Sequence, residues 1–259
     1  MEDIQKKLPQ YDYLYLGDNA RAPYGTRSFE VIYEYTLQAV QELFDRGCHL
    51  VILACNTASA KALRTIQQND LQRIAPGKKV LGVIRPSTEL IGSYSRSKEL
   101  GILATEGTVN SNSYVIELQK FFPECKVHQQ ACPMWVPLIE SNEHQTAEGK
   151  AFIQQDIDRL LNRSSNIDTI LLGCTHYPLI KKEIENIVPD TIKVVAQGEI
   201  VAESLENYLS RHPEIESNCT KGGKVSFFTS ENPQLFNKNA TRFTSYTVSS
   251  EHVDLSSKW

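Results

Sequence analysis

Two cysteines follow apolar runs in widely separated parts of the chain. Leu-Ala-Cys-Asn-Thr closes one run at Cys55, and Leu-Gly-Cys-Thr-His closes another at Cys174. Each cysteine stands at the carboxyl end of a predicted strand, directly before a predicted helix. The free N–H groups at a helix N-terminus bind carboxylates and lower the pKa of a thiol toward the thiolate. The sequence therefore predicts two chemically active thiols, each beside a place where an anion can bind.

The residues after each cysteine predict contacts to a small polar substrate. Asn56 and Thr57 follow the first cysteine and Thr175 follows the second, and all three add hydrogen-bonding groups. His176 can exchange a proton with a neighbouring thiol or stabilise its thiolate. These four residues are candidate substrate-binding residues, and His176 is also a candidate catalytic residue.

The residues alone leave three interpretations of the thiols open. One cysteine with His176 as its base would be a nucleophile for acyl transfer or disulfide chemistry. Two thiols that face each other would invert a stereocentre without a cofactor, because one base removes a proton from one face while the other delivers a proton to the opposite face. A cysteine that ends an apolar strand is also commonly core packing. The duplicated pattern favours a function, since core packing does not explain the polar residues that follow.

Neither the other cysteines nor the known motifs predict a metal or cofactor. Six cysteines among 259 residues are too few for a disulfide-based fold, and no C-x₂-C pair occurs. No Gly-rich dinucleotide loop, P-loop or H-E-x-x-H motif is present. We expect the remaining cysteines to be small buried hydrophobes; they are Cys48, Cys125, Cys132 and Cys219.

The elements that must position the two thiols alternate between strands and helices. Apolar runs predict strands at residues 13–16, 50–54, 80–84, 100–104, 169–172, 192–196 and 225–228. Helical patterns cover residues 29–46, 58–68, 111–122, 147–162 and a segment that includes 204–209. Most of the strands are continuously apolar, which indicates parallel sheets covered on both faces. The sequence predicts an α/β fold of two similar domains, with mainly parallel sheets flanked by helices and the active site in the cleft between them.

The boundaries of the two domains follow from the placement of the thiol-bearing strands. We expect residues 1–84 together with 196–259 to form the first domain and residues 85–195 to form the second. The stretch from Ser245 onward is polar and is predicted to be a frayed tail.

Composition excludes several classes of protein. A net charge of −4 and a pI near 5.9, without a run of basic residues, argue against binding to nucleic acid or to an anionic membrane. The first residues lack an apolar segment of the kind found in secretory signals, and no apolar run approaches the roughly 18 residues of a membrane span. We expect a cytoplasmic protein whose cysteines stay reduced.

Several segments together resemble the glutamate racemase family, cofactor-independent enzymes that make D-glutamate for peptidoglycan. The segments around the two thiols, residues 54–59 and 172–179, are similar to the two catalytic motifs of that family. Residues 15–25 resemble the early substrate loop of the family, and residues 107–111 and 131–140 resemble two further segments in the same order. The resemblance extends from about Leu8 to about Leu209.

The resemblance implies roles for individual residues. Cys55 and Cys174 would be the two acid–base thiols, and Tyr24 and Gly25 would hold glutamate through backbone groups. Asn56, Thr57 and Thr175 would bind its carboxylates and amino group. His176 would assist the thiol beside it, with Glu140 orienting the imidazole, and Thr108 is a candidate for the rim of the pocket.

The chain departs from the family pattern at its front. Family members begin with a strand that ends in Asp-Ser-Gly-x-Gly-Gly, whereas Met1 falls inside the helix that should follow this strand. We expect the first sheet to have unpaired backbone and Cys55 to have no supporting carboxylate. A misassigned start or a fragment with impaired folding and activity would explain the departure.

Three hypotheses for the function follow. The first is a glutamate racemase that uses the two thiols on glutamate as its small-molecule substrate. The second is a racemase of the same superfamily that acts on aspartate or another acidic amino acid. The third is a catalytically impaired protein that binds glutamate or a protein partner. The sequence leaves the oligomeric state open, a homodimer included.

Overall fold

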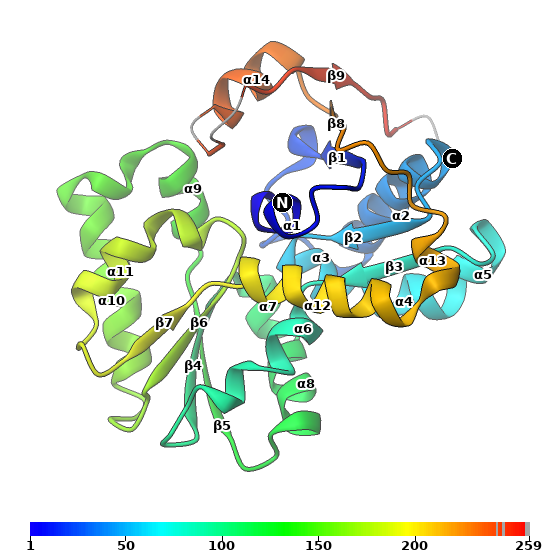
Figure 1. The fold of residues 1–259 in the computed structure, drawn as a ribbon. Helices are drawn as coiled ribbons and strands as arrows, with labels where there is room; N and C mark the ends of the chain where they lie inside the picture. Colours follow the sequence, from blue (N-terminus) through cyan, green and yellow to red (C-terminus); the bar gives the residue numbers. More distant parts are fainter. Residues whose placement is uncertain (242, 245–246, 257–259) are drawn as a thin grey trace.

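The computed structural model describes residues 1–241, 243–244 and 247–256, which form an α/β structure (Figure 1). Its sheets have the strand orders β1-β8-β9, β2-β3 and β5-β4-β6-β7. Every ladder between these strands is parallel, which confirms the predicted fold class. The strands are β1 (Tyr13–Gly17), β2 (Leu50–Leu53), β3 (Lys79–Gly82), β4 (Glu99–Ala104), β5 (Lys126–Ala131), β6 (Thr169–Gly173), β7 (Lys193–Val195), β8 (Val225–Thr229) and β9 (Ser250–His252).

The helices connect these strands and are mostly short. The α-helices are α1 (Glu2–Lys7), α2 (Phe29–Asp45), α3 (Asn56–Lys61), α4 (Leu63–Thr65), α5 (Leu71–Ile74), α6 (Ile84–Thr88), α7 (Glu106–Asn110), α8 (Ser113–Phe121), α9 (Trp135–Glu140), α10 (Ala147–Leu161), α11 (Lys181–Ile187), α12 (Gly198–Arg211), α13 (Pro213–Glu216) and α14 (Pro233–Ala240). Single turns of 3₁₀-helix are η1 (Asn19–Arg21), η3 (Ile91–Ser93), η4 (Glu143–Gln145) and η5 (Tyr177–Ile180), and η2 (Ile66–Asp70) is a π-helix.

Helices cover both faces of the four-stranded sheet. Alternate residues of a strand point to opposite faces, so β4 contributes Ile102 to the core under α8 and Leu103 to the core under α10. Central strands β4 and β6 are buried along nearly their whole length, as expected for parallel strands between two helical layers. The carboxyl ends of these strands therefore point out of a rigid, fully packed layer.

Two smaller sheets lie apart from the four-stranded one. Strands β1, β8 and β9, from the two ends of the chain, form one, and β2 and β3 form the other. Strand β1 pairs with β8, and β2 pairs with β3; among the described residues no strand pairs with the other edge of β1 or of β2. A shared apolar cluster packs against both sheets and includes Leu8, Leu205 and Leu209. Strands β1 and β2 are therefore edge strands of their sheets among the described residues.

Three elements differ from the prediction. Strand β5 is absent from the predicted strands because this edge strand is mostly polar, and it buries His128 and Gln130. The helix expected at 111–122 is present as α8, which begins at Ser113 because Asn112, with a φ of 54° in the left-handed region, separates it from α7. The strand expected at 80–84 ends at Gly82, and Ile84 begins α6.

The described part of the C-terminal stretch is not a frayed tail. Strand β9 extends the sheet beside β8, and Val253 and Leu255 are 6% and 2% exposed. Burial of these two apolar side chains and pairing with β8 order a segment whose polar composition predicted a tail. Residues 245–246 and 257–259 of the same expectation lie outside the described residues.

No helix within the described ranges is both long enough and apolar enough to cross a membrane. Of the four cysteines expected in the core, Cys132 is 1% exposed and the expectation is confirmed for it. Cys48, Cys125 and Cys219 are partly exposed and pack against the edges of apolar clusters.

Candidate active site

The candidate residues lie just beyond the carboxyl ends of parallel strands. Cys55 follows β2, Cys174 follows β6, and the loop of residues 18–25 follows β1. Ligands of open parallel sheets bind at these ends, where loops and helix N-termini meet. Two residues that sequence reasoning missed, Thr105 after β4 and Gln197 after β7, occupy the same kind of position.

Cys55 is the N-cap residue of α3 and is partly exposed. Burial raises its pKa, while hydrogen bonds from the backbone N–H groups of Ala58 and Thr57 and from the Thr57 hydroxyl lower it. The net direction is upward, so the sulfur is held as a thiol at rest. The same three donors would stabilise a thiolate once it forms.

The Cys174 thiol has a matching backbone environment at the start of η5. Its side chain is buried, and burial is the main cause that raises its pKa to about 12. The N–H groups of His176 and Tyr177 lower the pKa, whereas the charges of Cys55 and Glu140 raise it. A negative charge on Cys55 therefore disfavours a thiolate at Cys174.

An imidazole–carboxylate pair stands beside Cys174. The Cys174 Sγ lies 4.0 Å from His176 Nδ1, and His176 Nε2 lies 3.0 Å from Glu140 Oε1. The hydrogen bond to His176 is the main cause that lowers the pKa of Glu140, so the carboxylate stays ionised. A carboxylate accepts a hydrogen bond and cannot donate one, which places the imidazole proton on Nε2 and leaves the Nδ1 lone pair toward the thiol. Nδ1 can accept the thiol proton in this arrangement.

A cluster of three threonine hydroxyls joins α3 to β4 and α7. Thr57 Oγ1 lies 2.9 Å from Thr105 Oγ1, and Thr105 Oγ1 lies 3.0 Å from Thr108 Oγ1. All three residues are buried, and Thr108 is 0% exposed, so its expected place at the rim of the pocket was wrong. Because hydroxyl groups both donate and accept, this cluster can reorient to bind a carboxylate.

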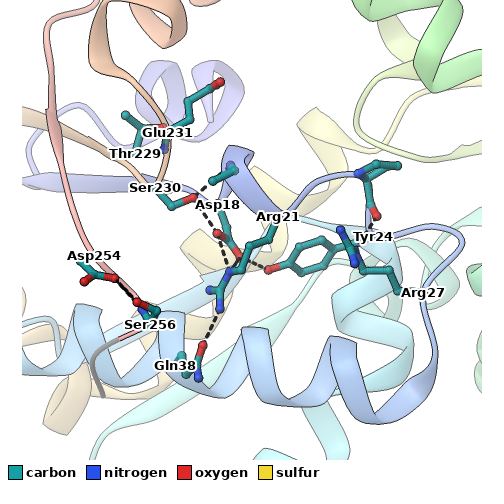
Figure 2. A network of polar contacts seen from close by, with 12 residues as sticks. Asp18, Arg21, Tyr24, Arg27, Gln38, Thr229, Ser230, Glu231, Asp254 and Ser256 are labelled. Atoms are coloured by element: carbon teal, nitrogen blue, oxygen red, sulfur yellow. Dashed lines mark hydrogen bonds and ion pairs between the residues drawn. The ribbon is translucent and has the colours of Figure 1, made fainter. Parts of the chain in front are cut away.

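Figure 2 shows how a carboxylate fixes the loop that contains Tyr24 and Gly25. Asp18 accepts hydrogen bonds from Arg21 Nε at 2.8 Å, from the Tyr24 hydroxyl, and from Ser230 Oγ at 2.7 Å. Burial, followed by Asp18, raises the pKa of Tyr24 well above its usual range, so the phenol stays protonated. The side chain of Tyr24 is thereby committed to contacts within the protein, and its expected substrate contact through the backbone stays a prediction.

The neighbouring glycine connects this loop to the other half of the site. The Gly25 carbonyl accepts a hydrogen bond from the Gly107 N–H at 2.8 Å. A Cβ atom at Gly25 would lie 3.0 Å from the Thr105 Cβ, so a larger residue would crowd the threonine cluster. The loop after β1 and the N-terminus of α7 therefore meet at Gly25.

Asn56 is 2% exposed, and each polar atom of its side chain makes a hydrogen bond within the protein. Its Nδ2 donates to Gln197 Oε1 at 2.8 Å, and its Oδ1 accepts from the Tyr114 hydroxyl at 2.6 Å. Thr175 lies between Cys174 and His176 with an exposed side chain. Of the predicted site residues, Thr175 stands apart from the hydrogen-bonded groups described above.

No group of three or more His, Cys, Asp or Glu side chains in the described part of the chain could hold a metal ion. The chemistry that the arrangement offers is proton transfer by two thiols. Helix N-terminal amides, a hydroxyl cluster and an oriented imidazole surround the thiols.

Comparison with known proteins gives a consistent result. A family model described as Asp/Glu/Hydantoin racemase matches residues 2–205. The chain is 39% identical over 253 residues to the glutamate racemase of Ruegeria sp. (strain TM1040), a match that covers 94% of this chain and 91% of that protein. It is 35% identical over 259 residues to the glutamate racemase of Listeria monocytogenes serotype 4a, covering 98% of this chain and 93% of that relative.

Solved structures show the same similarity in three dimensions. The crystal structure of a glutamate racemase isoform from Bacillus anthracis has a TM-score of 0.88 and 30% identity, and the match covers 98% of this chain and 92% of that one. A glutamate racemase from Francisella tularensis, solved in complex with D-glutamate, has a TM-score of 0.85 and 28% identity over 99% of this chain and 92% of that chain.

Proposed function

Because the chain belongs to the Asp/Glu/Hydantoin racemase family, we propose that it is an isomerase that interconverts L-glutamate and D-glutamate. The similarity to glutamate racemases, at 39% identity over 94% of this chain, supports the choice of substrate. The observation that supports the mechanism is the matching placement of the two thiols, Cys55 beyond the carboxyl end of β2 and Cys174 beyond that of β6, each with backbone N–H groups that lower its pKa.

In the proposed reaction the two thiols act on opposite faces of the α-carbon. One cysteine, as the thiolate, removes the α-hydrogen as a proton, and the electron pair of the C–H bond stays on carbon. The other cysteine, as the thiol, gives its proton to the opposite face. The product has the inverted configuration, the first sulfur has become a thiol and the second a thiolate, and atoms and charge balance without a cofactor.

The remaining candidate residues hold the substrate in this scheme. The hydroxyl of Thr57 and the N-terminus of α3 bind one carboxylate, since hydroxyl groups and free N–H groups both stabilise an anion. Asn56 and Thr175 bind the other polar groups of glutamate. The backbone of Tyr24 and Gly25 forms one wall of the site.

The proposal also includes a cellular role. The D-glutamate would be supplied to peptidoglycan synthesis in the cytoplasm, where both thiols stay reduced. Growth of a cell depleted of this protein should then depend on added D-glutamate. The homodimer is part of the same proposal, and sedimentation of the purified protein tests it.

The experiment that tests the reaction follows the α-proton in D₂O. L-glutamate incubated with the protein should lose its α-proton signal by NMR while its circular dichroism signal falls to zero. A faster reaction with L-aspartate than with L-glutamate would make aspartate the substrate. Tight binding of glutamate without exchange would contradict the racemase assignment and indicate a binding protein.

A further inference from the structure

A closed ring of buried side chains holds Asn56 next to Cys55. Gln197 Oε1 accepts from Asn56 Nδ2 at 2.8 Å, Gln197 Nε2 donates to the Tyr114 hydroxyl at 2.7 Å, and that hydroxyl donates to Asn56 Oδ1 at 2.6 Å. Asn56, Tyr114 and Gln197 are 2%, 0% and 6% exposed, so water does not compete for these groups. Neither Tyr114 nor Gln197 belongs to the residues that the thiol motifs single out.

The direction of every bond in the ring follows from one backbone carbonyl. Val83 O can only accept, and Ser87 Oγ donates its single proton to it at 3.0 Å. Ser87 Oγ must therefore accept from Gln197, which places Nε2 on that side at 2.7 Å and turns Oε1 toward Asn56. Nε2 also lies 3.2 Å from Val83 O, which confirms that the amide nitrogen is on that side. An amide nitrogen cannot accept a hydrogen bond, so the Tyr114 hydroxyl 2.7 Å away must donate its one proton to Asn56 Oδ1. The orientation of the Asn56 amide is thus determined by its surroundings.

The ring also connects the two segments at which the chain passes between its predicted domains. Val83 and Ser87 lie on the first passage, after β3, and Gln197 lies on the second, after β7. Gln197 spans both, because its Nε2 reaches Ser87 while its Oε1 reaches Asn56 at the start of α3. A change in either segment would reach Asn56 through this one side chain.

Resting on the proposed function, we propose that Gln197 and Tyr114 are positioning residues that fix the Asn56 amide for glutamate. One N–H of Nδ2 and one lone pair of Oδ1 are used in the ring, which leaves one N–H and one lone pair for substrate. If the Asn56 side-chain amide rotated by 180°, Oδ1 and Nδ2 would exchange places. The oxygen would then face the substrate group that needs a hydrogen-bond donor. The ring prevents that reversal because it would leave two like groups opposed inside a buried site.

The test is a double-mutant cycle with kinetics of glutamate racemisation. Gln197→Met keeps the length of the side chain but removes both hydrogen-bonding groups, and Tyr114→Phe removes only the hydroxyl. Each should lower kcat/KM by roughly 10-fold, mainly through KM, because a misoriented Asn56 amide binds glutamate less tightly. In an Asn56→Ala background the same substitutions should have almost no further effect.

A matched control is Gln67→Met. Gln67 Nε2 also donates to a backbone carbonyl, that of Val80 at 2.7 Å, but it contacts no candidate site residue. The control should change kcat/KM by less than about 2-fold. Undiminished losses for Gln197→Met in the Asn56→Ala background, with a matching fall in melting temperature, would overturn the positioning role and leave a structural one.

A second readout does not depend on activity. The side-chain amide protons of Asn56, identified in the NMR spectrum by their loss in Asn56→Ala, should exchange slowly with water in the unmodified protein. Exchange should accelerate in Gln197→Met and in Tyr114→Phe but not in Gln67→Met. Equal exchange in all four proteins would overturn the inference even if glutamate is racemised. If glutamate is not racemised, faster exchange in the two variants would still support it.

Discussion

The two thiols have the same backbone environment but different side-chain neighbours. At Cys55 the amides of the second and third following residues, Thr57 and Ala58, lower the pKa of the thiol, and at Cys174 the amides of His176 and Tyr177 do so. Burial raises the pKa of both thiols. The shared geometry therefore stabilises a thiolate without forming one in the resting protein.

The difference between the sites lies in where the thiol proton can go. Cys174 has the Nδ1 lone pair of His176 at 4.0 Å, oriented by Glu140. Beside Cys55 the described residues provide a hydroxyl, fixed N–H groups and the protonated phenol of Tyr24, and none of these is a base at neutral pH. One thiol thus has an internal proton acceptor, and the other depends on substrate or solvent.

In a racemase, this difference between the two thiols can change only some of the kinetic constants separately for each direction. The equilibrium constant between enantiomers is one, so kcat/KM must be equal in the two directions for any variant. A defect at one thiol therefore lowers both values together. It separates the directions only in kcat, in KM and in the isotope effect of the step that the thiol performs.

Loss of either thiol is expected to have the largest effect. Cys55→Ser and Cys174→Ser should each lower the racemisation rate by at least about 1,000-fold, because a hydroxyl is far less acidic than a thiol and cannot supply the base or acid of one face. The measurement is circular dichroism of glutamate with time. Cys125→Ser is the matched control, since Cys125 precedes β5 at the amino end of the four-stranded sheet, and this variant should keep its full rate. Substantial racemisation by either active-site variant contradicts the two-thiol mechanism.

Removal of the imidazole should lower kcat/KM less than loss of a thiol does, and by the same factor in both directions. His176→Gln is expected to lower kcat/KM by about 100-fold near neutral pH. Without Nδ1 the Cys174 proton must leave to water, and the pKa of this thiol is about 12. Its thiolate fraction, and hence the rate, should then rise about tenfold per pH unit below that value and approach the unmodified protein under alkaline conditions.

The primary deuterium isotope effect sharpens this second prediction. In His176→Gln it should increase for the enantiomer from which Cys174 removes the proton and stay near its original value for the other. His212→Gln is the matched control, since His212 Nδ1 also pairs with a glutamate, Glu214, at 2.9 Å, but on an exposed surface. Equal isotope effects in both directions would show that the imidazole does not serve Cys174 alone.

The orienting carboxylate should have a smaller effect than the imidazole. Glu140→Gln keeps the shape of the side chain but removes the charge that holds the proton on Nε2, and a loss of about 10-fold in kcat/KM is expected. Because the pKa of Glu140 is lowered, its carboxylate stays ionised at pH values at which an ordinary glutamate is already partly protonated. This contribution should therefore persist in mildly acidic buffer and disappear only as the pH falls through the lowered value. Glu214→Gln provides the control, and a loss that sets in near neutral pH would assign the effect to another group.

The two thiols could be predicted from the sequence because one local rule covers them. A polar or reactive residue directly after a buried parallel strand lies at the edge where ligands bind, and Cys55 and Cys174 follow that rule. Thr105 and Gln197 follow it as well and were missed only because the rule was applied to cysteines. Tyr114 has no such signal, because it lies inside α8 and its role depends on which helix face packs against Asn56.

The fold was predictable to the extent that its strands are buried on both faces. Continuously apolar strands such as β4 and β6 can be recognised in the sequence, whereas β5 lies at an edge, is mostly polar and buries His128 and Gln130. Strand β9 has only three residues, and its pairing with β8 is set by tertiary structure. Partners such as Ser230, which is more than two hundred residues from Asp18 in sequence, could not be assigned from local pattern.

The smallest effect is expected at Tyr24, the titratable residue beside Cys55. Tyr24→Phe removes a hydroxyl that donates to Asp18, so it should reduce the free energy of unfolding by about 1 kcal/mol and leave kcat within about 3-fold. The reason is that burial and the Asp18 charge keep the phenol protonated, so it cannot accept the Cys55 proton. Chemical denaturation gives the stability, and racemisation with and without the substitution gives the rate. A loss of kcat as large as that in His176→Gln would mean that Tyr24 and Asp18 relay the Cys55 proton as His176 and Glu140 relay that of Cys174, and the two sites would then differ in the chemistry of the relay rather than in its presence.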